Sequence, residues 1–346
     1  MNPIFHALET PNLAGQPASA TQPVQSSKNT GLLQVHVVSI QNSFPIQNAV
    51  VSISLPGSEG KVLERLTTNS SGQTEEISLP APPEDISLDA AAAIDERPYA
   101  EYDLHIEAPG FQPLTISGTE ILSGSTALQT AALTPASEET APEADITIPD
   151  HTLYGIYPPK IAEPEIKPVS ESGEIVLSRV VVPETIIVHD GVPSDRTASN
   201  YYVPYRDYIK NVASSEIYSS WPEPTIVANV LAIMSFTLNR VYTEFYRNQG
   251  YDFTITSSTA FDHKWIYGRN IFQSISLVVD EIFDNYLSRP EVRQPILTQY
   301  CDGKRVQCPN WMTNLQKHIN IIIVVFWMFF KNSLCFEANI RIFFYR

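Results

Sequence analysis

The stretch YIKNVASSEIYSSWPEPTIVANVLAIMSFTLNR, residues 208–240, decides the fold of the second half of the chain. Apolar side chains recur there and just beyond at spacings of three and four residues: Val227, Leu231, Met234, Leu238, Val241 and Phe245. This spacing predicts an amphipathic helix of about 20 residues with one buried face. We expect Ser219 or Ser220 to cap it, with Pro222 or Pro224 in its first turn. The preceding DYIKNVASSEIY, residues 207–218, predicts a shorter helix, joined to the long one by a Trp221-Pro222 turn.

Working outward toward the N-terminus, short alternating segments separated by Gly and Pro turns fill residues 31–135. We expect strands in LQVHVVSI (33–40), AVVSISL (49–55), VLERLTT (62–68), EISLPAPP (76–83), YAEYDLHIEAPGF (99–111) and PLTISGTEIL (113–122). Alternation places two sets of side chains on single faces, namely Ala49, Val51, Ile53 and Leu55, and Tyr102, Leu104 and Ile106. The pattern predicts an N-terminal all-β sandwich followed by an α+β domain, in a multidomain chain.

The pieces PIQNAVVSI, TTNSSG and YDLHIEAPGF make residues 31–135 resemble a carboxypeptidase regulatory-like (transthyretin-like) domain. The resemblance implies a sandwich without catalytic residues, used for adhesion or as a spacer. Residues 1–30 are rich in Gln, Ser, Ala, Thr and Pro, so we expect a flexible N-terminus, and they lack the basic and apolar regions of a Sec signal peptide. Residues 136–184 repeat Pro and Glu and predict a semi-extended linker.

The charge of the chain is uneven. The 346 residues carry a formal charge of −16; residues 1–170 hold 21 acidic and 6 basic side chains, whereas residues 171–346 hold 17 and 16. This balance argues against a protein that grips nucleic acid through a broad basic face. It also indicates that the two halves do different work.

Residues 185–313 resemble the stage II sporulation protein D / amidase enhancer LytB (SpoIID/LytB) family. The resemblance rests on the helical hairpin quoted above, then on TSSTAFDHKWIYGRNI, SISLVVDEIFDNYL and ILTQYCDG in the family's order. It implies a protein of the cell wall whose partners are peptidoglycan glycan strands, with a cell-wall amidase as a further partner. If the chain is exported, we expect it at the cell wall, in sporulation or wall remodelling.

The family includes lytic transglycosylases, and the resemblance places their catalytic carboxyl group at Glu216. A single carboxyl group with a raised pKa can act first as acid and then as base. Ile217, Tyr218 and Trp221 could supply apolar surroundings, and Tyr218 or Trp221 could stack on a sugar. The alternatives are a catalytically silent glycan-binding or amidase-enhancing module, and a phage-tail or secretion-apparatus component. Without the family, Glu216 would be an ordinary solvated helix carboxylate and Trp221 a core aromatic.

Two departures from the family pattern weigh on the enzymatic interpretation. Met234-Ser235-Phe236 stands where the family has Arg-Thr-Tyr, and Lys264-Trp265 stands where it has Cys-Gln. Some members bind zinc near this point, but here only His263 remains, so we expect no metal and no cofactor. We expect His263 to be an exposed loop histidine.

The C-terminal 33 residues differ in composition from the rest. Residues 314–346 lack Gly and Pro and are dominated by Asn, Lys, Ile and Phe, which share A/T-rich codons. We interpret them as a frameshifted or otherwise non-native tail, which would leave the SpoIID-like domain truncated. The competing interpretation is a membrane anchor, but the apolar run 319–330 is shorter than the roughly 17–25 residues that span a bilayer. Cys301 and Cys308 could form a disulfide or remain two thiols.

Overall fold

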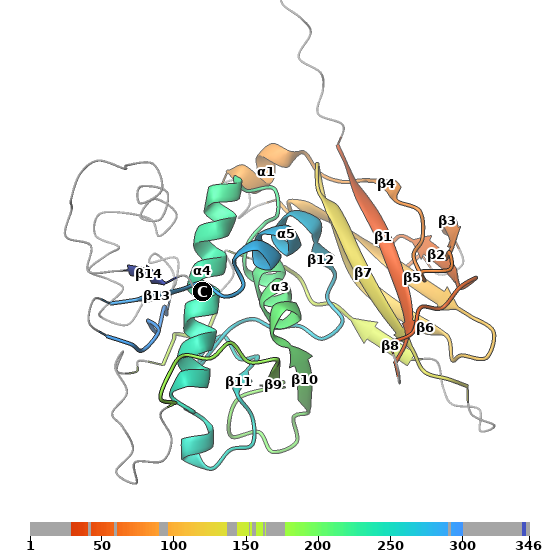
Figure 1. Ribbon diagram of the computed structural model, residues 1–346. Helices are drawn as coiled ribbons and strands as arrows, with labels where there is room; N and C mark the ends of the chain where they lie inside the picture. Colours follow the sequence, from red (N-terminus) through yellow and green to blue (C-terminus); the bar gives the residue numbers. More distant parts are fainter. Residues whose placement is uncertain are drawn as a thin grey trace, which may run out of the picture.

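The computed structural model describes residues 29–40, 43–58, 61–89, 96–136, 144–151, 153, 157–161, 163, 177–289, 292–299 and, for the backbone, 341–343. The strands of the N-terminal half lie to one side of three longer helices, and the smaller sheets of the second half lie beside those helices (Figure 1). The chain is β-rich with few helices, as expected. Residues 1–28 of the predicted flexible N-terminus, Cys301, Cys308 and nearly all of the suspected tail lie outside the described residues.

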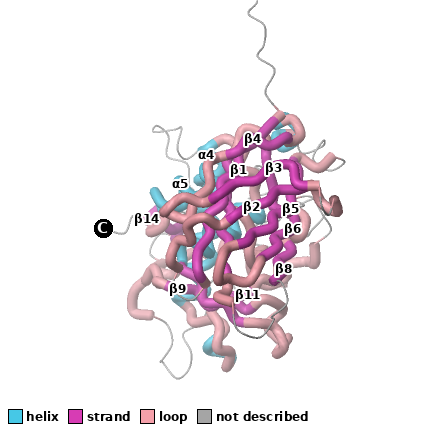
Figure 2. Tube along the Cα trace, turned by 90° about the vertical axis from the view of Figure 1, so that its right-hand side faces the viewer, coloured by secondary structure: helices cyan, strands magenta, loops and turns pink. Residues whose placement is uncertain are grey.

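Two sheets pack together in the N-terminal half, and Figure 2 shows their strands in magenta. One has the order β12-β7-β1-β4 and the other β3-β2-β5-β6-β8. Their strands are β1 (Thr30–Ser39), β2 (Val50–Ser54), β3 (Val62–Thr67), β4 (Ile77–Pro80), β5 (Tyr99–Glu107), β6 (Leu114–Leu122), β7 (Thr126–Leu133) and β8 (Ala144–Thr147). A short helix, α1 (Glu84–Leu88), follows β4.

The predicted alternation is confirmed in most of the sandwich. Tyr102, Leu104 and Ile106 are buried on one face of β5, and Val51 and Ile53 are fully buried in β2. The buried face of β2 ends at Ile53 and not at Leu55, because Leu55 lies beyond the last paired residue of β2 and is 47% exposed.

The second half contains a three-stranded sheet and the helical hairpin. Its elements are β9 (Thr185–His189), β10 (Asn200–Pro204), α3 (Tyr205–Glu216), α4 (Glu223–Tyr242), the 3₁₀ turn η1 (Arg247–Gln249), β11 (Ile255–Thr256), β12 (Ile271–Phe272), α5 (Gln273–Ile282), β13 (Tyr286–Ser288) and β14 (Arg341–Phe343). The sheet order is β10-β9-β11, and β13 pairs with β14. Helices α3, α4 and α5 pack on one another, and α5 also contacts β7 of the sandwich (Figure 1).

Helix α4 lies close to the predicted bounds but is capped differently. Pro222 precedes it with no side-chain cap, whereas the Ser219 hydroxyl donates to Ser125 Oγ and Ser220 Oγ lies 2.7 Å from Ser87 Oγ. The two serines therefore tie the hairpin to the sandwich instead of capping the helix. By length and composition α4 could cross a membrane, but 83% of that window is buried inside the protein.

The two halves share a sheet. Strand β12 pairs with β7, matching Ile271 to Leu128 and Phe272 to Ala127, and so extends a sandwich sheet with residues from the second half. The sandwich also continues past residue 135, since β8 pairs with β6. Further along the segment predicted as a linker, two described residues contact the second half: Ile161 N–H donates to Ala260 O, and Glu163 pairs with Arg240.

Candidate functional site

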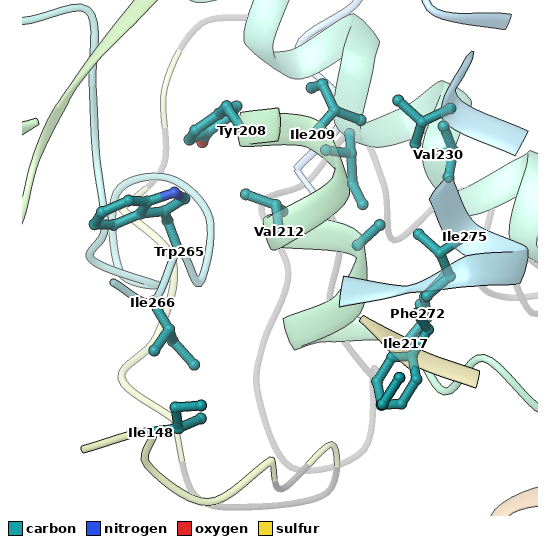
Figure 3. Packing of buried hydrophobic residues seen from close by; sticks show 14 of the residues in the cluster. Ile148, Tyr208, Ile209, Val212, Ile217, Val230, Trp265, Ile266, Phe272 and Ile275 are labelled. Carbon is teal, nitrogen blue, oxygen red and sulfur yellow. The ribbon is translucent and has the colours of Figure 1, made fainter. Parts of the chain in front are cut away.

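Glu216 is the last residue of α3. Tyr208, Ile209 and Val212 are fully buried: Tyr208 and Val212 point toward the loop that carries Trp265 and Ile266, whereas Ile209 points toward Val230 of α4 (Figure 3). The helix ends at Ile217, whose backbone is extended. Because the C-terminal end of a helix carries partial negative charge, this position disfavours an ionised carboxylate.

The carboxyl group of Glu216 is held from the opposite loop. Oε1 accepts a 2.7 Å hydrogen bond from the backbone N–H of Lys264. Burial raises the pKa of Glu216 to about 7, although the Lys160 and Lys264 ammonium groups and the Lys264 N–H act in the other direction. Glu216 is half-buried. Near neutral pH the protonated and ionised forms are therefore both populated, which suits a group that must give and then take a proton.

A buried ion cluster fixes the loop opposite Glu216. Arg240 of α4 binds Glu163 through two hydrogen bonds of 2.6 and 2.7 Å, and its Nε donates to Asp262 Oδ1 at 2.7 Å. The other oxygen of Asp262 accepts from the Tyr246 hydroxyl and from both the amide and hydroxyl of Thr256. Because both carboxylates are paired with Arg240 and the cluster is buried, the cluster fixes the start of the 262–264 loop.

Lys160 joins the predicted linker to this loop. Its Nζ donates to the backbone carbonyl of Asp262 and lies 5.9 Å from the ring centroid of Phe236. Burial lowers the pKa of Lys160, while Glu216 and Asp262 act to raise it. A residue of the Pro/Glu-rich segment thus belongs to the surroundings of Glu216.

His263 is fully buried, so the expectation of an exposed loop histidine was wrong. Its Nδ1 lies 3.2 Å from the hydroxyl of Tyr208, and its ring lies 4.5 Å from that of Phe236. Burial holds its pKa well below the usual range, and Lys160 and Arg240 act in the same direction. His263 is therefore a neutral packing residue beside the site.

Tyr218 and Trp221 follow Glu216 but are engaged by the rest of the protein. Tyr218 is 1% exposed, with its ring 4.9 Å from His151, and Trp221 packs edge-on against it. The Trp221 indole N–H donates to the carbonyl of Ser87 in the sandwich. In this conformation both rings support the end of α3, and their predicted contacts with substrate stay predictions.

A second buried charge cluster joins the two halves beneath the site. Glu120 of β6 makes hydrogen bonds of 3.0 and 2.5 Å to Arg269, and its Oε2 lies 3.0 Å from His151 Nδ1. Arg269 and His151 lower the pKa of Glu120 to about 2 despite its burial. Burial lowers the pKa of His151 to about 4, so His151 is neutral at pH 7.

Sequence reasoning missed most of the residues that surround Glu216. Arg240 gave a signal, since it is the one basic residue in the 20-residue helix α4. Lys160 and Glu120 gave none. In the part of the chain that the structure describes, no group of three His, Cys, Asp or Glu side chains could hold a metal ion.

No protein family matches the chain, and no curated protein matches it. Among solved structures, the Bacillus anthracis TIE protein is 16% identical over 31% of this chain and 17% of its own, with a TM-score of 0.21. GBS52, the minor pilin of Streptococcus agalactiae, is 16% identical over 33% of this chain and 48% of its own, with a TM-score of 0.22. The Klebsiella pneumoniae 5-hydroxyisourate hydrolase is 20% identical over 31% of this chain and 92% of its own, with a TM-score of 0.20. This chain thus covers less than half of the first two, and no functional argument rests on scores this low.

Proposed function

We propose that this chain binds peptidoglycan glycan strands and cleaves them in the manner of a lytic transglycosylase, with Glu216 as its acid and base. The observation that carries the proposal is the setting of Glu216: a half-buried carboxyl group at the end of α3, hydrogen-bonded to Lys264 N–H, with a pKa raised to about 7. The sequence resemblance to the SpoIID/LytB family supplies the substrate class. The sandwich, in this proposal, is a carboxypeptidase regulatory-like domain.

The reaction needs one carboxyl group and no water. Protonated Glu216 donates its proton to the glycosidic oxygen as the bond from that oxygen to the muramyl C1 breaks. The resulting carboxylate takes the proton of the muramyl C6 hydroxyl, and O6 bonds to C1 to close a 1,6-anhydro ring. Glu216 returns to its protonated form, so the cycle is balanced.

The neighbours of Glu216 serve both halves of this cycle. Burial favours the protonated acid at the start, whereas the Lys264 N–H and the nearby Lys160 ammonium stabilise the carboxylate formed in the first step. The Arg240–Asp262–Glu163 cluster holds the loop that presents Lys264. Lys160 and Lys264 are thus positioning residues, and Glu216 is the group that touches the reacting atoms.

The competing function is a glycan-binding module without catalysis. One observation favours it: Tyr218 is 1% exposed and the indole N–H of half-buried Trp221 is bound to the Ser87 carbonyl, so in this conformation Tyr218 cannot stack on a sugar and the Trp221 N–H is not available to one. Such a module would bind glycan strands and leave their ends unchanged.

Product analysis of purified glycan strands separates the two. The full chain is expected to generate 1,6-anhydromuramyl ends, and Glu216→Gln to abolish them. Glu223→Gln is the matched control, because Glu223 is exposed at the start of α4 and is expected to leave the reaction unchanged. Strand binding without new anhydro ends would reject the enzyme and support the binding module.

A further inference from the structure

Three aromatic rings lie together beside the loop whose Lys264 N–H binds Glu216. The ring of Tyr201, from β10, stacks on that of Tyr267 with centroids 4.7 Å apart and lies 5.2 Å from that of Trp265. Trp265 is nearly buried, whereas Tyr267 is 40% exposed. We call Tyr201, Trp265 and Tyr267 the aromatic platform.

The aromatic platform lies near Glu216, because two of its rings closely follow Lys264, the residue whose backbone N–H binds Glu216. Lys264, whose N–H donates to Glu216, directly precedes Trp265 and is three residues from Tyr267. Since consecutive Cα atoms are about 3.8 Å apart, the Cα atoms of Lys264 and Tyr267 are separated by at most about 11 Å. A polymer bound at Glu216 could therefore reach the platform with a neighbouring unit.

Tyr267 is held on a rigid turn. Gly268 follows it with φ +75°, and Arg269 N–H reaches back to Ile266 O at 3.4 Å, so Tyr267 occupies the first corner of a tight turn. Asn211 of α3 brackets the turn, accepting from Ile266 N–H at 3.0 Å and donating to Ile266 O at 2.7 Å.

The sandwich supports the same turn from the other side. Gln129 of β7 donates to Gly268 O at 2.9 Å, and Glu120 binds the Arg269 guanidinium. An exposed aromatic ring on a backbone fixed from both halves loses little conformational entropy when a ligand binds. This is the arrangement expected of a binding surface, because the exposed part of the ring adds nothing to the core.

We propose that the aromatic platform is a sugar subsite, at which Tyr267 stacks on an N-acetylhexosamine ring of the strand that reaches Glu216. The C–H face of a pyranose is apolar and fits an aromatic ring, while its hydroxyl and amide groups remain in water. Aromatic rings also stack on nucleobases, but the net charge of −16 disfavours a polyanion. The choice of ligand rests on the proposed function; the binding itself does not require cleavage.

The test measures binding of neutral N-acetylglucosamine oligomers to the full chain by titration calorimetry, in a Glu216→Gln background that prevents turnover. Tyr267→Ala is expected to weaken binding at least about tenfold, and Tyr267→Trp to retain it. Tyr202→Ala is the matched control: the neighbouring tyrosine is 74% exposed, and strand alternation places it on the opposite face of β10 from Tyr201. It is expected to bind as the parent does.

Several results would overturn the subsite: no binding of the oligomers by the parent, unchanged binding by Tyr267→Ala, equal loss in Tyr202→Ala, or preferential binding of a single-stranded oligonucleotide. If the Tyr267→Ala variant does not fold, the test rests on Tyr267→Trp and Tyr267→Phe, which both keep an aromatic ring. Weakened binding in both of these variants would contradict a stacking role. If the wild-type protein forms no anhydro ends, the cleavage proposal is rejected, but the binding measurement still tests the sugar subsite.

Discussion

The backbone N–H of Lys264 donates a 2.7 Å hydrogen bond to the carboxylate of Glu216, which joins the end of α3 to a loop 48 residues later. The loop is fixed at its start by Asp262 and Arg240 and further on by Arg269 and Glu120. The setting of Glu216 therefore depends on both halves of the chain.

Glu216→Gln is expected to stabilise the protein above pH 7. The pKa of Glu216 is raised from 4.5 to about 7, so the folded state holds this proton more tightly than the unfolded state, and the associated stability is lost as the pH rises from 4.5 through 7. Replacing the carboxylate should increase the free energy of unfolding at pH 8 by about 1–3 kcal/mol. Urea denaturation at pH 5 and pH 8 measures this; equal stability of the two proteins at pH 8 would contradict it.

His151 is expected to make the protein sensitive to acid. Its folded pKa of about 4 lies below the ordinary 6.5, so its contribution to stability is present above pH 6.5 and is lost as the pH falls to 4, by about 3 kcal/mol. Glu216 acts in the opposite direction over part of this window, and the experiment is therefore done in the Glu216→Gln background.

In that background, urea midpoints are compared at pH 6.5 and pH 4.5. His151→Phe keeps an aromatic ring next to Tyr218 but cannot take up a proton, so the difference between the two midpoints should shrink. An undiminished difference would show that the acid sensitivity arises elsewhere.

Glu120→Gln is expected to destabilise the protein by about 3–5 kcal/mol, because it leaves the Arg269 guanidinium buried with an uncompensated charge. The Glu120→Leu/Arg269→Met double variant should cost less than the sum of its single variants. Arg97→Met is the control, since Arg97 is 47% exposed in its pair with Glu101 and should change stability by less than about 1 kcal/mol. Thermal denaturation of the parent and the five variants measures the coupling, and additive costs would exclude an energetic coupling between Glu120 and Arg269.

Gly268→Ala is expected to disturb the turn that carries Tyr267. A Cβ there would lie 2.5 Å from Cγ2 of Ile146, and the left-handed backbone at φ +75° adds strain. Together these should lower the free energy of unfolding by about 1–3 kcal/mol. Gly110→Ala has a similar φ of +81° with nothing within 4 Å, so it should be milder and leave sugar binding intact. Comparable losses of stability and of sugar binding in both variants would argue against a specific role for the turn.

The elements that could be predicted from the sequence are those whose pattern lies within a single helix or strand. The three- and four-residue spacing located α4, although the helix is buried on nearly all sides and not on the single face predicted. Strand alternation located the buried faces of β2 and β5. Prolines near Trp221 placed the start of the long helix correctly, although the expected serine cap is absent. These patterns depend only on residues within one element, which is why they can be read without the fold.

The rest depends on pairings between distant residues. Glu120 and Arg269 are 149 positions apart. The sequence around each looks like that of a solvated charge, and the two residues meet only because β12 pairs with β7. Lys160 and Glu163 sit in a Pro/Glu-rich segment whose composition indicates exposure, yet Arg240 draws Glu163 into a buried ion pair. His263 was expected in an exposed loop, but both His263 and its neighbour Asp262 are fully buried.

The most direct test of the central claim is the pH dependence of anhydromuramyl-end formation by the full chain on purified glycan strands. If Glu216 must be protonated to begin the reaction, the rate falls as the pH rises through about 7, and Glu216→Gln forms no anhydro ends at any pH. A rate that does not change between pH 6 and pH 8, or anhydro ends that persist in Glu216→Gln, would contradict the assignment of Glu216 as the acid and base.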